Sequence, residues 1–277
     1  MYIQTYIHNI HFLLFNLVDT NNVPEPFAFY PLNGKCKTQE ENEREKYSGV
    51  HLADGPTGSP KGSYKFTGAA DSYIVFRQIH RQEQCSFTIL CWIYPENTDG
   101  LIFHCKASQS WEVHMWMKSG KLVAKFTANS NDQSVLRLKT EHPLPLNQWH
   151  HVGLSYDYNT NTKNASLWLK GKGVYEGTII LDTLSPSEII VRLGATEGDG
   201  HYFKGRITAM EIYDVFLTEK KILATGKAGQ SNFKFTIERF THPTSSFSQL
   251  IFPGKSKNAI GLPFYDGKVL SFLHVCG

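Results

Sequence analysis

The chain contains twelve histidines, the side chains that most readily transfer protons or hold metals near neutral pH. His150 and His151 are adjacent in a segment of alternating polarity, so in a strand they point to opposite faces and cannot hold one ion together. His150 is in phase with Val152, which indicates a hydrogen-bonded histidine in the core. No H-E-x-x-H motif is present. The histidines therefore predict no catalytic or metal site.

Paired carboxylates of the kind that hydrolyse glycosidic bonds are also missing. Glu112 shares a strand face with His114, and Glu211 shares one with Tyr213, but neither pair supplies two acids at the required spacing. The chain lacks G-x-S-x-G and G-x-x-x-x-G-K-[ST] motifs as well. We expect a protein without catalytic residues.

Two turn segments offer oxygen atoms of the kind that Ca²⁺ prefers. Asn97 and Asp99 lie in a turn that follows a proline, and Glu197 and Asp199 lie in a glycine-rich loop. These residues are equally ordinary members of turns. Calcium is therefore one of two interpretations of each loop, and we expect no other cofactor.

Aromatic side chains on otherwise polar strand faces are candidates for binding a ligand, because sugars stack on such rings and interface hot spots favour them. Trp116 and Trp168 each lie opposite the apolar face of their strand. Their rings are exposed unless another element covers that second face. Asp199, His201 and Tyr202 cluster at the glycine-rich loop. These five residues form the candidate ligand-binding set.

The five cysteines form no C-x-x-C motif, which argues against a zinc or redox centre. Cys91 and Cys105 lie in predicted strands on either side of the turn at residues 95–100. If these strands form a tight hairpin, a disulfide can join them. They are otherwise inert buried thiols. An odd count leaves one thiol over, and the set is Cys36, Cys85, Cys91, Cys105 and Cys276.

The hydrophobic pattern has a period of two along most of the chain, which predicts half-buried strands. Residues 149–157 and 165–169 read as two strands joined by a polar loop, and residues 86–94 are apolar on both faces, as in a central strand. The apolar phase slips between Ile207 and Met210, which indicates a bulge. Thr218 is positioned to cap a short helix near residue 220.

Composition narrows the class of protein. An aromatic content of 13% favours strands over helices, and a net charge of +3 without a cluster of basic residues does not indicate a nucleic-acid partner. No run of about 18 apolar residues is present, so we expect no membrane span.

Several motifs in a fixed order resemble the laminin G-like domain, a member of the concanavalin A-like lectin/glucanase superfamily that is related to the pentraxins. They are W-H-H-V at residues 149–152, Y-D at 156–157, L-x-L-x-G at 167–171, F-x-G-R-I at 203–207, and I-Y followed by L-T-x-x-x-I at 212–222. The resemblance implies an all-β antiparallel sandwich, a jelly roll of the concanavalin A type. It also implies a non-catalytic extracellular module for recognition or adhesion that binds a glycan or a protein.

Two other functions are alternatives to this one. The first is a glycan-processing enzyme, although the E-x-D-x-x-E acids of the superfamily's glucanases are absent; the second is a structural spacer without a ligand. Calcium in many related domains, and disulfides in an extracellular setting, are further implications of the resemblance. If the protein is secreted, we expect a glycan on Asn164, in the sequon N-A-S.

We divide the chain into three segments. Residues 1–26 are a leader or flanking segment, in which residues 10–18 have the length of a signal-peptide core but lack its usual flanks. Residues 27–225 form the jelly-roll domain. Residues 226–277 remain unassigned, either as a poorly ordered tail or as the start of a second module.

Overall fold

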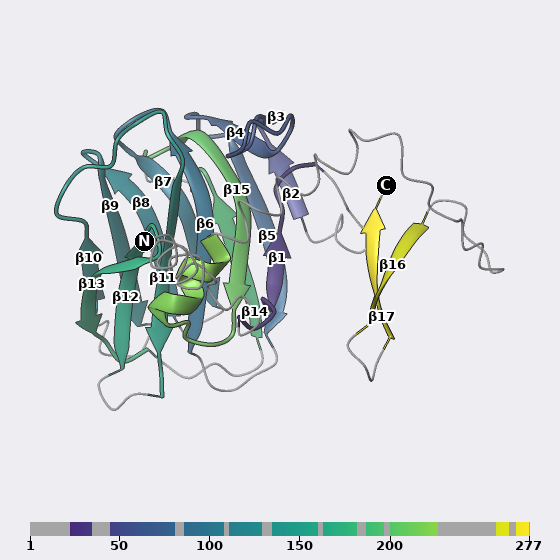
Figure 1. The fold of residues 1–277 in the computed structure, drawn as a ribbon. Helices are drawn as coiled ribbons and strands as arrows, with labels where there is room; N and C mark the ends of the chain where they lie inside the picture. Colours follow the sequence, from purple (N-terminus) through teal and green to yellow (C-terminus); the bar gives the residue numbers. More distant parts are fainter. Residues whose placement is uncertain are drawn as a thin grey trace, which may run out of the picture.

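A computed structural model describes residues 23–34, 45–80, 86–107, 111–128, 135–159, 163–181, 187–196, 200–226, 259–265 and 270–276. The described chain forms two antiparallel sheets packed face to face (Figure 1). The predicted all-β jelly-roll sandwich is therefore confirmed. Among the described residues, no helix is both long and apolar enough to cross a membrane.

The first sheet, which we call sheet 1, has β6 and β11 near its centre. In order across the sheet, its strands are β13 (Lys172–Thr178), β12 (Asn164–Leu169), β11 (His150–Asp157), β6 (Phe87–Pro95), β15 (Lys204–Tyr213), β4 (Ser63–Thr67) and β3 (Val50–Ala53), with β1 (Ala28–Tyr30) also paired to β15.

The second sheet, sheet 2, has β7 and β8 near its centre. Its order is β10 (Val135–Lys139), β9 (Lys121–Ala128), β8 (Trp111–Lys118), β7 (Gly100–Ala107), β14 (Ser187–Leu193), β5 (Tyr73–His80) and β2 (Glu45–Ser48). A separate two-stranded sheet pairs β16 (Ala259–Tyr265) with β17 (Leu270–Cys276).

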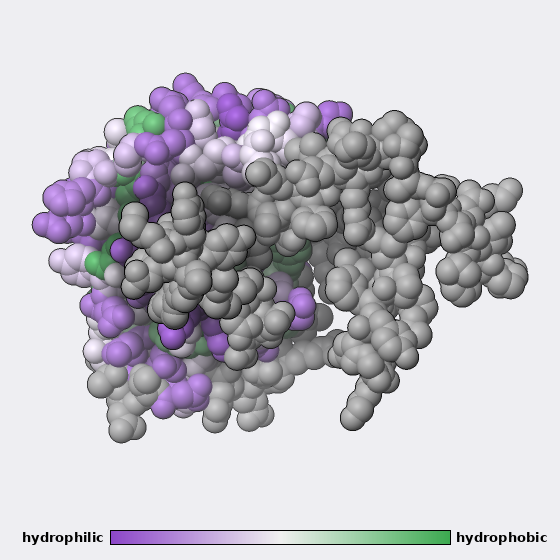
Figure 2. Space-filling model, in the orientation of Figure 1, coloured by the Kyte–Doolittle hydropathy of each residue, from purple (hydrophilic) through white to green (hydrophobic). Residues whose placement is uncertain are grey.

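The main core lies between the two sheets and takes the inward side chains of both. Phe87 of β6 stacks on Trp111 of β8 with ring centroids 4.7 Å apart, so this aromatic contact helps to join the sheets. On the face shown in Figure 2, the described surface is mostly hydrophilic with separate hydrophobic residues, as expected when most apolar side chains pack in the core.

Both faces of strand β6 are covered, which explains why its residues are apolar on both sides. Its outer face packs into a second, smaller cluster beneath a short helix over residues 219–226, shown in green in Figure 1. The members of this cluster are Leu90, Trp168, Tyr213, Leu217 and Ile222. The helix near residue 220 is therefore confirmed, and its first turn places the amide of Ile222 3.0 Å from the carbonyl oxygen of Thr218.

The prediction that Trp168 is an exposed candidate for ligand binding is corrected, because this residue is only 4% exposed. The chain after β15 folds back over the outer face of sheet 1 and covers this ring. The indole Nε1–H donates a hydrogen bond of 2.7 Å to Ser155 Oγ, which satisfies its polar atom inside the cluster.

Cys91 and Cys105 are free, buried thiols, so of the two interpretations of this pair the disulfide is wrong and the inert thiols are confirmed. The turn at residues 95–100 carries the chain from β6 in sheet 1 to β7 in sheet 2, and the two strands are not hydrogen-bonded neighbours. Burial raises the pKa of Cys105 to about 12 and raises that of Cys91 as well, which leaves both thiols inert. The side chains of the other cysteines lie outside the described residues.

The predicted bulge in β15 is confirmed, since the pairing with β6 shifts between Thr208 and Glu211. Ala209 within this interval has a φ of 47°. The extra residue lets both Ile207 and Met210 reach the main core.

Gly153 provides a test of how sheet 1 is packed. A Cβ at this position would lie 2.4 Å from Leu90 Cδ2 and 2.5 Å from the carbonyl oxygen of Ile89, which belongs to the backbone of a central strand. We expect Gly153→Ala to lower the free energy of unfolding by about 1–3 kcal/mol through overpacking. Denaturant unfolding followed by tryptophan fluorescence measures the change.

Gly173→Ala is the matched control, because this strand glycine would meet only the edge of the Trp168 ring, at 3.3 Å. Its effect should be clearly smaller. Equal effects of the two substitutions would contradict the close approach of Leu90 to Gly153.

Candidate functional site

A pocket of about 270 Å³ opens on the outer face of sheet 1, beside the helix. Its walls come from the end of β6, the start of β11, the turn after β12 and the helix. The lining residues are Trp92, Trp149, His151, Lys170, Gly171, Leu223 and Gly226.

The pairing of β6 with β11 places the two aromatic rings of the pocket floor. Trp92 and His151 are direct partners in this pairing, and both point outward because Cys91 and Val152 point into the core. Their rings stack with centroids 5.0 Å apart and an interplanar angle of 28°. Trp149 stands at the rim, half-buried, with its ring edge against Tyr94.

Glycines allow the helix to approach the strands closely. Gly171 ends the turn after β12 with a φ of 79°, and a Cβ there would lie 3.0 Å from the Cα of Leu223. A Cβ at Gly226 would lie 2.9 Å from His151 Nδ1. Either side chain would push the helix away and change the shape of the pocket.

The pocket combines aromatic surface with one cation. Burial lowers the pKa of His151 to about 4, so its imidazole is neutral at neutral pH. Lys170 is exposed at the rim, and none of the described lining residues is a carboxylate. Such a site can stack a sugar or another flat ligand and donate hydrogen bonds to it, but it lacks the acids for hydrolysis.

Four of the candidate residues from the sequence meet at one end of the sandwich. The amide of Leu101 donates to the carbonyl oxygen of His201 at 3.1 Å, and Tyr202 forms a parallel bridge with Leu101, so this segment lies beside the turn that holds Asn97 and Asp99.

Asp99 already has a structural role in this turn. Its carboxylate accepts hydrogen bonds from the amide of Ser119 at 3.0 Å and from Thr98 Oγ1 at 2.7 Å. The Ser119 amide is the main reason why the pKa of Asp99 lies below its usual value. Calcium binding at Asn97 and Asp99 stays a prediction, and Glu197 and Asp199 lie outside the described residues.

The candidate aromatic residues do not form one site. Trp116 is half-buried on the outer face of sheet 2, whereas Trp168 is covered on sheet 1. The sequence also did not reveal Trp92, Trp149 and His151 as one group, because the pairing of residues 149–157 with residues 86–94 could not be predicted from either segment alone. The phase of Trp92 and His151, opposite to Cys91 and Val152, was the available signal. His150 is confirmed as a core histidine, 1% exposed and 2.8 Å from the carbonyl oxygen of Pro145.

The buried neutral imidazole of His151 predicts a loss of stability in acid. Between the ordinary pKa of about 6.5 and the folded value of about 4, the unfolded chain binds more protons than the folded chain. The free energy of unfolding should therefore decrease as pH falls through this window. We expect His151→Phe, which keeps the stack on Trp92, to remove up to about 3 kcal/mol of this decrease in urea unfolding series at pH 7 and pH 4.

His142→Gln is the control, because the side chain of His142 is 84% exposed and an imidazole there is hydrated in both states. The same pH dependence in wild type and His151→Phe would show that His151 is not held neutral by burial.

Three solved structures with similar folds are distant in sequence from this chain. The receptor-binding domain of botulinum neurotoxin type G is 14% identical, with a TM-score of 0.52, 77% of this chain covered and 52% of that chain. The binding domain of Paraclostridial Mosquitocidal Protein 1 is 16% identical, with a TM-score of 0.51 and coverages of 72% and 50%. This chain thus spans about half the length of these two domains.

A third structure is matched over nearly its whole length. Domain 4 of AbnA, an extracellular arabinanase from Geobacillus stearothermophilus, in complex with arabinotriose, is 18% identical, with a TM-score of 0.53, 72% of this chain covered and 97% of that chain. At these identities the similarity establishes the fold alone.

No curated protein has a matching sequence. The family model for laminin G-like domains, described as the concanavalin A-like lectin/glucanases superfamily, matches residues 67–223, more than half of the chain. This match and the two-sheet architecture agree, and the chain belongs to the concanavalin A-like lectin/glucanase superfamily.

Proposed function

We propose that this chain is a non-catalytic extracellular recognition module that binds a glycan in the pocket formed by Trp92, Trp149, His151 and Lys170. The observation that carries the proposal is the aromatic floor and rim of this pocket. Indole and imidazole faces provide apolar surface for the C–H face of a sugar ring, and Lys170 provides a donor for its hydroxyl or carboxylate groups.

The pocket also favours this function over the two alternatives. A glycan-processing enzyme needs two carboxylates at the scissile bond, and the described lining supplies none. A spacer without a ligand has no need of a concave site with a half-buried tryptophan, Trp149, at its rim. The arabinotriose complex of the arabinanase domain shows that a protein with this fold can bind a sugar, and it makes arabinan oligosaccharides a rational first probe.

Truncation of Trp149 tests the proposal. A glycan array with the full chain identifies the oligosaccharide that binds most tightly, and calorimetric titration then measures the affinity of the chain for it. We expect Trp149→Ala to weaken binding at least about tenfold, because the substitution removes a stacking surface at the rim without opening the main core.

Trp116→Ala is the matched control, since Trp116 lies on the outer face of the other sheet. It should leave the affinity unchanged. Loss of binding in Trp116→Ala but not in Trp149→Ala would place the ligand elsewhere, and release of shorter sugars from the bound oligosaccharide would show an enzyme.

Glycosylation of Asn164 follows from the proposed extracellular location. Asn164 is the first residue of β12 and is half-buried, while the following Ala165 and Ser166 are covered. We expect a protein secreted from eukaryotic cells to migrate faster after enzymatic deglycosylation, and Asn164→Gln to migrate at that position without treatment. Identical mobility of all samples would contradict a glycan at Asn164.

A further inference from the structure

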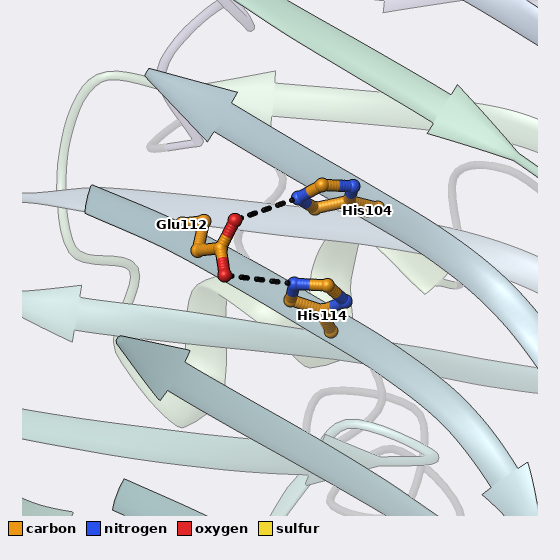
Figure 3. A group of neighbouring side chains, drawn as sticks. All are labelled: His104, Glu112 and His114. Carbon is orange, nitrogen blue, oxygen red and sulfur yellow. Dashed lines mark ion pairs between the residues drawn. The ribbon is translucent and has the colours of Figure 1, made fainter. Parts of the chain in front are cut away.

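Two histidines and one glutamate converge on the outer face of sheet 2. His104 of β7 and His114 of β8 are direct partners across the two strands, and Glu112 lies two residues before His114 on the same face. Figure 3 shows the carboxylate of Glu112 facing both imidazoles. Their three ligand atoms lie within 4.8 Å of one another.

The imidazole nitrogens that face Glu112 make only long contacts with its carboxylate. His104 Nε2 lies 3.3 Å from Glu112 Oε2, and His114 Nε2 lies 3.5 Å from Glu112 Oε1. Both nitrogens are buried, and neither makes a hydrogen bond of acceptable geometry within the described structure. Unsatisfied buried polar atoms are costly, so two of them at one carboxylate require an explanation.

A direct hydrogen bond to the carboxylate does not supply that explanation, because the two contacts with Glu112 are long and lack hydrogen-bond geometry. Two imidazole nitrogens and a carboxylate that converge without a well-formed hydrogen bond between them are a set of groups that can hold a cation.

We propose that His104, Glu112 and His114 bind a divalent transition-metal ion of the zinc class. Two imidazole nitrogens and one carboxylate oxygen are typical zinc ligands, whereas calcium takes oxygen ligands. Ligand atoms of a tetrahedral zinc site lie about 3.3–3.4 Å apart for bonds of about 2.0–2.1 Å. The two nitrogen-to-oxygen distances at Glu112 are close to this value.

The arrangement of the rings indicates what must move on binding. The two imidazoles stack with centroids 3.9 Å apart and an interplanar angle of 18°, so their lone pairs run nearly side by side. Binding of one ion by both rings therefore requires rotation about χ2. The side chains are 19%, 21% and 24% exposed, which leaves the fourth position of the metal open to solvent.

One neighbouring cation favours an anion at that open position, because Lys125 is the partner of His114 across β8 and β9. The site lies on the opposite sheet from the pocket, so this inference does not depend on the proposed glycan function.

Zinc titration of the full chain, after removal of metal by a chelator and dialysis, tests the site. We expect the double variant His104→Gln/His114→Gln to bind one equivalent less than wild type. Glu112→Gln, which keeps both histidines and the shape of the side chain, should weaken binding at least about tenfold, because even outer-shell partners contribute that much. Wild type titrated with Co²⁺ should gain the visible absorption of a tetrahedral site, and the variants should lack it.

His142→Gln is the matched control, because His142 Nε2 lies 3.9 Å from a carboxylate oxygen of Glu141 in an exposed pair without a third ligand. It should bind as wild type does. Circular dichroism and thermal melting without metal establish whether each variant is folded. If the double variant is unfolded, the zinc titration of Glu112→Gln alone tests the proposal. Zinc affinity and stoichiometry in folded Glu112→Gln equal to those of wild type, or absence of zinc binding by wild type, would overturn the proposal.

Discussion

The close approach of Leu90 to Gly153 at the centre of sheet 1 is the contact on which the outer face of this sheet depends. Because Gly153 has no side chain, Leu90 of the neighbouring strand fills the space above it. Leu90 then joins Trp168 and Ile222 in the cluster beneath the helix. The helix in turn supplies one wall of the pocket, so the absence of a single Cβ in a central strand helps to shape a site on the surface.

The two sheets use the same inward pattern and differ in what their outer faces carry. The outer face of sheet 1 is largely closed by the helix, and the pocket opens where that cover ends, at Trp149 and Lys170. The outer face of sheet 2 carries polar groups in rows set by the strand register, in which His104 and His114 stand side by side. One scaffold thus presents an aromatic concavity on one side and a cluster of metal ligands on the other.

The sequence predicted those features that depend on local periodicity. The strands, the helix near residue 220, the slip in β15 and the inward His150 all follow from the phase of apolar residues along single segments. Features that depend on partners far along the chain were missed or wrong. Cys91 and Cys105 read as hairpin partners because nothing local shows that the chain changes sheet between them. Trp168 reads as exposed because its cover arrives about 50 residues later.

The most direct test of the central claim is an NMR titration of the five tryptophan indole N–H signals with the tightest-binding oligosaccharide. The signals are assigned with single Trp→Phe variants. Ligand in the proposed pocket should shift the signals of Trp149 and Trp92 and leave those of Trp111, in the main core, and Trp116, on sheet 2, unchanged. A shift confined to Trp116, or binding without any shift at Trp149 and Trp92, would contradict the assignment of the ligand site to sheet 1.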